Sequence, residues 1–271
     1  MELGLSSYTF GWAVGVPGYT PTKPLDEHGL LDKCHAHGVK LLQIGDNLPL
    51  HTFDDVRLVR LAQRAADEGV QLEIGARGLT PHHVARYANI ARRLEAKFIR
   101  FVIDDGDYHP QPDAVTGILR ETAPLLDGLT LGIENHDRFS AATLRSIVDD
   151  LFTDRIGVCL DTANSFGGGE DIRKVAATLA PITVNLHVKD FVIERVPYLM
   201  GFTISGRPAG AGMLDLPQLL QRIVPFGRCA TAILELWTPP EPQLEDTIAK
   251  EVRWAAQSME YLKPLFAQVD R

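Results

Sequence analysis

The chain has 271 residues, of which 45% are hydrophobic and 23% are charged, and its formal net charge is -8 at pH 7. This length and composition fit a globular protein built as one large α/β barrel or as two smaller domains. The acidic balance disfavours a nucleic-acid partner, which requires a basic surface. We expect a cytoplasmic protein with no membrane partner, because the sequence shows neither a secretory signal nor an apolar run of about 18 residues.

Strand-like runs alternate with helix-like segments along the whole sequence. The runs cover residues 3–10, 40–46, 71–78, 98–104, 130–136, 156–164, 183–190 and 229–237. Between the second and third runs lies an amphipathic segment whose apolar face is predicted to consist of Val56, Val59, Leu61 and Ala62.

Turn and cap residues mark where the predicted helices begin and end. Thr80 directly precedes Pro81, which is typical of a capping side chain followed by proline in the first helical turn. Gly38 and Gly69 follow helical segments and suit the left-handed position after a helix. These signals support an element order of strand, helix, strand, helix.

Eight strand–helix units in about 250 residues predict a (β/α)8 TIM barrel of the α/β class, as one domain over residues 1–271. A doubly wound open sheet is the alternative, with its ligand at one switch point. Two segments rich in proline and glycine, 11–24 and 196–212, follow the first and seventh runs. We expect both to form long loops at the active-site rim.

Four consecutive strand-like runs end in a residue that binds metals, namely Glu134, Asp161, His187 and Glu235. The carboxyl ends of neighbouring barrel strands meet at one rim, so three carboxylates and an imidazole are expected to converge there. A divalent cation would relieve their mutual repulsion. This ligand set suits Mn²⁺ or Mg²⁺, with Co²⁺ or Zn²⁺ as alternatives.

The alternation of side chains along a strand adds nearby candidates. If Glu134 points into the barrel mouth, His136 does so as well, and it could donate a hydrogen bond or a proton. If His187 points inward, so does Lys189, which could act in catalysis or simply neutralise the carboxylates. Asp190 would then point away and serve a structural role.

Three further residues are candidates for substrate binding. Asn164 lies just beyond the strand that ends in Asp161. Arg207 could hold an anionic group together with Lys189, although it could equally be a surface residue. Trp237 could stack on the face of a sugar or pack against the rim.

At these residues the sequence resembles the xylose isomerase-like superfamily of sugar phosphate isomerases and epimerases. The resemblance covers nearly the whole chain and is carried by Glu134, Asp161, His187, Glu235, the motif HVKD at 187–190, and Gly210, Gly212 and Asp215. It implies one divalent metal bound by those first four residues. It also implies that the two glutamates stand near the substrate carbons that gain and lose protons, that the substrate is a small carbohydrate or sugar acid, and that the chain pairs as a homodimer.

Two positions depart from the pattern of the family's epimerases. Asn164 stands where many of them have a histidine, and Lys189 takes the polar position of an arginine found after the histidine ligand. The stretches around these residues resemble a narrower branch of 3-oxo-isoapionate decarboxylase-type sugar-acid lyases.

The predicted function is therefore a metal-dependent isomerase or epimerase of a keto sugar or sugar acid. The alternative is a lyase at the same site, either a 3-oxo sugar-acid decarboxylase or a keto-cyclitol dehydratase. Both reactions pass through an enediolate next to a polarised carbonyl. An endonuclease IV-like repair enzyme is disfavoured by the net charge, and a non-catalytic sugar-binding protein by the full ligand set.

Overall fold

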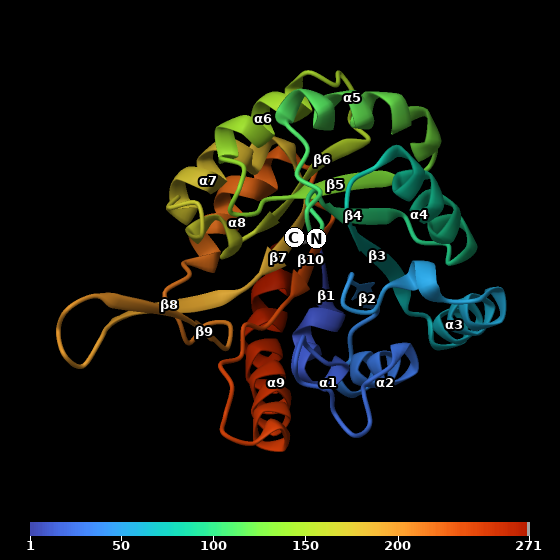
Figure 1. Cartoon of the computed structure of the whole chain (residues 1–271). Helices are drawn as coiled ribbons and strands as arrows, with labels where there is room; N and C mark the ends of the chain where they lie inside the picture. Colours follow the sequence, from blue (N-terminus) through green and yellow to red (C-terminus); the bar gives the residue numbers. More distant parts are fainter. Residues whose placement is uncertain (270–271) are drawn as a thin grey trace.

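The computed structural model describes residues 1–269, and the strands within them form a closed parallel barrel (Figure 1). Around the barrel the order is β1, β10, β7, β6, β5, β4, β3, β2, so closure excludes an open doubly wound sheet. These strands are β1 (Glu2–Ser6), β2 (Leu41–Ile44), β3 (Gln71–Arg77), β4 (Phe98–Val102), β5 (Thr130–Glu134), β6 (Ile156–Asp161), β7 (Thr183–Val188) and β10 (Thr231–Leu234).

Helices follow the strands and form the outer layer of the barrel (Figure 1). They are α1 (Gly11–Val14), α2 (Glu27–His37), α3 (Asp55–Glu68), α4 (Pro81–Arg93), α5 (Pro112–Thr122), α6 (Ala141–Asp149), α7 (Ile172–Leu179), α8 (Leu216–Ile223) and α9 (Leu244–Val269). No helix within residues 1–269 combines the length and the apolar character needed to cross a membrane. The predicted single domain also includes Asp270 and Arg271, which lie outside the described residues.

The predicted helix boundaries are confirmed. The side chain of Thr80 accepts a hydrogen bond from the backbone N–H of His83 and caps α4, with Pro81 in the first turn. Gly38 and Gly69 adopt left-handed conformations after α2 and α3, with φ of 58° and 62°. Glycine takes this conformation without steric cost, so both helices end there.

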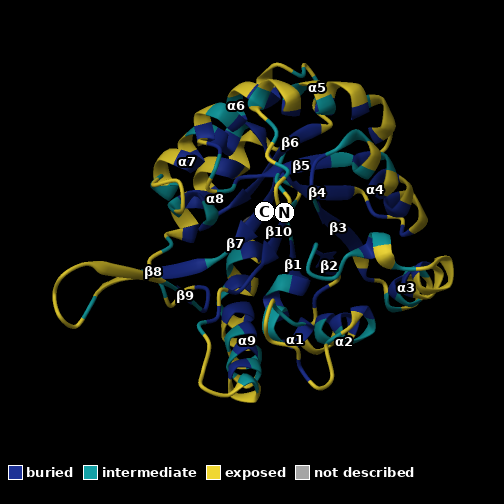
Figure 2. Ribbon diagram, viewed as in Figure 1, coloured by how far each residue is buried: buried dark blue, intermediate teal, exposed yellow. Residues whose placement is uncertain are grey.

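The barrel strands are buried on both faces, whereas the outer surfaces of the helices are exposed (Figure 2). The predicted buried face of α3 is wrong in part. Val56 and Val59 are exposed, and the face that packs on the barrel consists of Leu58, Leu61 and Ala65. These three residues are spaced at i, i+3 and i+7, which places them on one side of the helix. The two valines lie next to that side, toward the solvent.

The segment after β7 is not the loop predicted for residues 196–212. It contains an antiparallel hairpin of β8 (Asp190–Arg195) and β9 (Phe202–Arg207), which projects from the barrel (Figure 1). At its base, a Cβ added to Gly206 would lie 1.9 Å from the carbonyl oxygen of Trp237. The hairpin therefore packs directly against the segment that follows β10, and only glycine permits this approach.

Candidate metal centre

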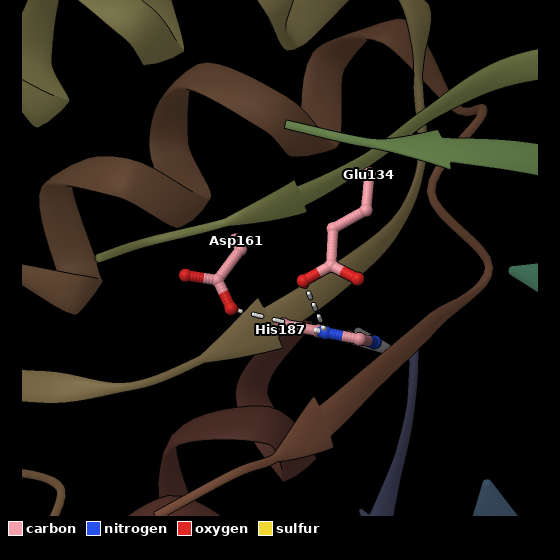
Figure 3. A group of neighbouring side chains, drawn as sticks. All are labelled: Glu134, Asp161 and His187. Atoms are coloured by element: carbon pink, nitrogen blue, oxygen red, sulfur yellow. Dashed lines mark ion pairs between the residues drawn. The ribbon is translucent and has the colours of Figure 1, made fainter. Parts of the chain in front are cut away.

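Four predicted ligands meet at the carboxyl ends of adjacent barrel strands. Glu134 and Asp161 are the last residues of β5 and β6, His187 lies in β7 opposite Asp161, and Glu235 directly follows β10. Each is at most 2% exposed. Figure 3 shows the carboxylates of Glu134 and Asp161 directed toward the imidazole of His187.

The ligand atoms of Glu134, Asp161 and His187 all lie within 4.8 Å of one another. The Nδ1 atom of His187 lies 3.7 Å from Glu134 Oε1, 3.9 Å from Asp161 Oδ2 and 3.4 Å from Glu235 Oε1. Among the described residues, this buried nitrogen has no hydrogen-bond partner. Divalent cations bind imidazole nitrogens together with carboxylate oxygens. The buried nitrogen without a partner and the oxygens that it faces therefore fit a metal ion.

Two residues that the sequence analysis missed fix the imidazole of His187. Gln43 donates from Nε2 to Glu73 Oε2 at 2.9 Å, so its Oε1 faces His187 Nε2 at 2.7 Å and accepts a hydrogen bond. Gln43 therefore holds a proton on Nε2, and Nδ1, which faces the carboxylates, is the nitrogen that would bind a metal ion. Such a support holds a metal-binding histidine in the required tautomer and orientation.

Lys189 lies inside the cluster. Its Nζ is 2.8 Å from Asp161 Oδ2 and 2.9 Å from Glu235 Oε2, and its side chain is 16% exposed. Burial lowers the pKa of Lys189, but the charges of Asp161 and Glu235 outweigh that effect and raise the pKa above its usual value. The ammonium group therefore remains charged beside the ligand oxygens.

Arg100, in β4, is a second buried cation that the sequence analysis missed. Its Nε lies 2.8 Å from Glu134 Oε2, and its Nη1 lies 2.6 Å from Asp46 Oδ1. Asp46 also accepts hydrogen bonds from the Tyr8 hydroxyl and from Arg77. Burial would raise the pKa of Glu134, but Arg100, with help from His187 and Lys189, holds that pKa well below its usual value.

A cavity of about 400 Å³ opens beside the cluster, and Lys189, His136, Asn164, Trp237 and Tyr8 are among its lining residues. The amide of Asn164 donates to Glu134 Oε1 at 2.8 Å, while Lys189 Nζ lies 3.5 Å from its Oδ1. His136 and Trp237 are partly exposed at the rim. The structure thus brings these sequence-predicted residues together with the ligand cluster.

Arg207 is placed elsewhere. Its guanidinium bonds Glu194 Oε2 at 2.7 Å on the hairpin, and Arg207 is not among the residues that line this cavity. The alternation of inward-facing and outward-facing side chains applies to the barrel strands. Arg207 lies in β9, outside the barrel.

Asp190 has the predicted structural role. Its carboxylate accepts hydrogen bonds from the backbone N–H groups of Gly210, Gly212 and Leu214, at 2.9, 2.9 and 3.0 Å. Asp215, the last residue of the Gly-x-Gly-x-x-Asp motif, caps α8. These motif residues therefore fix the chain where it runs from the hairpin back to the barrel.

Comparison with known proteins agrees with this architecture. Residues 31–265 match the family described as the xylose isomerase-like TIM barrel, and the chain belongs to this family. A curated relative, 3-oxo-isoapionate decarboxylase of Pectobacterium atrosepticum, is 34% identical over 266 residues, which cover 97% of this chain and 95% of the relative.

Solved structures share the fold at low sequence identity. D-psicose 3-epimerase with D-tagatose from Clostridium cellulolyticum H10 superposes with a TM-score of 0.73 at 14% identity, covering 98% of this chain and 99% of its own. A xylose isomerase-like TIM barrel protein from Mycobacterium smegmatis in complex with magnesium gives 0.71 at 14% identity, covering 96% and 97%. The curated relative and the epimerase are enzymes, and the buried cluster of this chain has the donor atoms of a metal site.

Proposed function

We propose that the protein is a divalent-metal-dependent decarboxylase that releases CO2 from a 3-oxo sugar acid. The observation that carries this proposal is the charged Lys189, fixed within 2.9 Å of Asp161 and Glu235 at the wall of the cavity. The 34% identity to a decarboxylase over nearly the whole chain supports it. The proposal reverses the order of the sequence analysis, which ranked isomerisation first.

The contacts of the two glutamates favour decarboxylation over epimerisation. Both oxygens of Glu134 are engaged, one by Arg100 and one by Asn164. Both oxygens of Glu235 are engaged as well, one by Lys189 and one by the Ser6 hydroxyl at 3.0 Å. Epimerisation needs carboxylates that take a proton from carbon and return one, whereas the oxygens of both glutamates are already held in these contacts.

Loss of CO2 needs no base, only an electron acceptor and a later proton donor. A divalent cation bound by Glu134, Asp161, His187 and Glu235 would supply a Lewis acid near the substrate's ketone. As the C–C bond to the carboxylate breaks, the electron pair passes toward the ketone oxygen. The Lys189 ammonium then gives a proton to the carbon that lost CO2, and Lys189 regains a proton from solvent.

The cavity also suits a small polyol acid. Trp237 presents an aromatic ring for the C–H face of a sugar chain, and His136 offers a hydrogen-bond donor at the rim. A second cavity of about 210 Å³ adjoins His136 and is lined by Arg77 and Arg138 among other residues. A substrate of a few carbons would extend from the first cavity toward the second, where the two arginines lie.

The test is ¹³C and proton NMR in D2O with a panel of 3-oxo sugar acids labelled at the carboxyl carbon, and with ketoses in parallel. We expect labelled CO2 or bicarbonate to form with Mn²⁺ or Mg²⁺, and its rate to fall to the uncatalysed level in EDTA. The proposal fails if ketoses gain deuterium next to the carbonyl while no acid loses CO2. That result would make the protein a metal-dependent isomerase.

A further inference from the structure

A cavity of about 370 Å³ lies between α7, α8 and the base of the β8–β9 hairpin. The two helices are neighbours in the outer layer, and the hairpin leaves the barrel beside them (Figure 1). We call this space the helix cavity, and its lining includes Phe166, Ile172, Phe191, Leu214 and Leu219. None of its lining residues belongs to the ligand cluster, so it is a separate site.

The walls of the helix cavity are mainly apolar. The rings of Phe166 and Phe191 meet edge to face, with their centroids 4.4 Å apart. At the rim, Met213 is 58% exposed although its side chain is apolar. A volume of this size with apolar and aromatic walls is typical of sites for small molecules, in which a few polar groups fix the orientation of the ligand.

One face of α8 supplies polar groups to the helix cavity. Four lining residues are spaced at i, i+3, i+4 and i+7, namely Asp215, Gln218, Leu219 and Arg222. The carboxylate of Asp215 caps the helix and accepts a hydrogen bond from the backbone N–H of Gln218 at 3.0 Å. The guanidinium of Arg222 forms no hydrogen bond or ion pair with another described residue.

The other charged pair of the helix cavity is already satisfied. Asp171 caps α7, and its Oδ2 lies 2.9 Å from Nη2 of Arg173. Arg222 is therefore the cation of this described lining that has no carboxylate beside it. A guanidinium binds a carboxylate through two parallel hydrogen bonds, so a ligand with one carboxylate and an apolar body matches both the charge and the walls.

We propose that the helix cavity binds a small carboxylic acid with an aromatic or aliphatic body, and that the bound acid changes the affinity of the ligand cluster for a metal ion. The carboxylate pairs with Arg222, while the body lies against Phe166 and Phe191. An inorganic anion would leave the apolar walls uncovered, and an uncharged hydrocarbon would leave Arg222 without a partner.

Phe166 connects the helix cavity to the metal centre. Among the described residues, it alone lines both the helix cavity and the cavity beside Lys189. It ends the short 3-10 helix Asn164–Phe166, and the amide of Asn164 donates to Glu134 Oε1 at 2.8 Å. An acid that presses on Phe166 therefore acts on the helix that holds Asn164 against a metal ligand. This inference does not depend on which reaction the site catalyses.

Titration calorimetry with phenylacetate and octanoate tests the binding, with uncharged phenylacetamide as the matched control. The protein is treated with EDTA, so that no metal ion attracts the carboxylate. We expect phenylacetate to bind at least about tenfold more tightly than phenylacetamide, because a hydrogen bond to a charged group is stronger than a neutral one. Arg222→Gln should remove that difference.

Three further variants locate the bound acid. Gln218→Trp, which adds an indole to an exposed lining residue, should weaken the binding of both acids. Arg253→Gln removes an exposed arginine on α9, and it should bind phenylacetate as the wild type does. Lys189→Gln should also leave this affinity unchanged, whereas an acid bound beside the ligand cluster would lose its partner. Circular dichroism of each variant checks that it is folded.

Manganese titration with and without saturating phenylacetate tests the coupling. We expect the Kd for Mn²⁺ to change by at least about fivefold, and the change to be absent in Arg222→Gln at the same phenylacetate concentration. By linkage, the Kd for phenylacetate should change by the same factor when Mn²⁺ is bound. Equal Kd values for Mn²⁺ would overturn the regulatory part of the proposal.

Three results would overturn the binding site itself. One is the absence of binding by both acids at millimolar concentration. Another is equal affinity for phenylacetate and phenylacetamide in the wild type, which would leave Arg222 without a role. The third is binding that Lys189→Gln abolishes and Arg222→Gln does not change, which would place the acid beside the ligand cluster.

Discussion

Each buried carboxylate of the ligand cluster has a cationic side chain beside it. Arg100 bonds Glu134, and Lys189 bonds both Asp161 and Glu235. A buried charge without a partner is costly, so these two cations allow the protein to fold before a metal binds. The two cations differ in their access to the cavity, because Arg100 is enclosed by protein whereas Lys189 reaches the cavity.

Replacing Arg100 with methionine should destabilise the protein strongly. Glu134 would keep a buried negative charge without its main partner, and removing one member of a buried pair costs about 3–5 kcal/mol. Urea unfolding of Arg100→Met should show this loss, and Arg100→Met/Glu134→Gln should recover much of it. Equal stability of the single and double variants would show that Arg100 acts through Asp46 instead.

Replacing Lys189 with glutamine should strengthen metal binding while it abolishes CO2 release. The ammonium lies on oxygens that a cation would use, and a like charge at about 4 Å costs on the order of 1–4 kcal/mol near a protein surface. Titration calorimetry with Mn²⁺ should therefore give at least a roughly fivefold lower Kd. Lys174→Gln, an exposed change on α7, is the control. An unchanged or higher Kd for Lys189→Gln contradicts the argument.

The sequence predicted that the residues of this cluster would meet at the barrel mouth, but not which side chains would hold them in place. Glu134, Asp161 and His187 stand at strand ends, where a polar residue after an apolar run is conspicuous. Arg100 and Gln43 instead lie inside apolar strands, and a single polar residue there has no partner that can be read along the chain. Their partners come from other strands, so only the closed barrel reveals them.

At the scale of elements, the helix α9 holds the short helix α1, which follows β1 in the chain. Glu251 on α9 accepts hydrogen bonds from the backbone N–H groups of Trp12 and Ala13, at 3.0 and 3.2 Å. Burial raises the pKa of Glu251 to about 7, although these N–H groups act in the opposite direction. The same segment after β1 also carries Tyr8, which lines the cavity beside Lys189.

This contact predicts a pH-dependent stability. Because the folded pKa of Glu251 lies above its unfolded value of 4.5, its protonated form stabilises the fold at acidic pH. That stability is lost as pH rises from 4.5 through 7, by at most about 1.4 kcal/mol per pH unit and roughly 3 kcal/mol in total. Urea unfolding from pH 5 to 8 should show this loss in the wild type and in the control Glu260→Gln.

The variant Glu251→Gln should lose much less stability over the same pH range, because its amide cannot ionise. Parallel pH profiles for Glu251→Gln and the wild type would mean that another group causes the dependence. The readout needs no substrate and no metal, so it is independent of the proposed reaction.

The sequence predicted some of the secondary-structure elements correctly and others wrongly. Long apolar runs and cap residues located the barrel strands and helix ends, since these signals are local. The β8–β9 hairpin was taken for a loop because its strands are exposed and lack the alternation of a half-buried sheet. The face of α3 was misplaced because valines next to the buried stripe resemble part of it, and only packing against the barrel decides between them.

At the scale of the whole molecule, closure of the barrel places side chains from four strands in one buried site. Glu134 and Glu235 are about a hundred residues apart in sequence, yet both lie near His187 Nδ1. A cation at this point would join β5, β6, β7 and β10 across the barrel mouth. Metal binding should therefore stabilise the entire fold and not only one loop.

Thermal unfolding measures this linkage directly. A metal present at a hundred times its Kd contributes about 2.7 kcal/mol to the folded state, which corresponds to a rise in Tm of roughly 5–10 °C for a domain of this size. Calorimetry of EDTA-treated protein, with and without Mn²⁺, should show that rise. His187→Ala should unfold at a temperature that Mn²⁺ does not change, because the variant lacks the nitrogen that faces the three carboxylates. A Tm that rises equally in both proteins would place the metal outside this cluster.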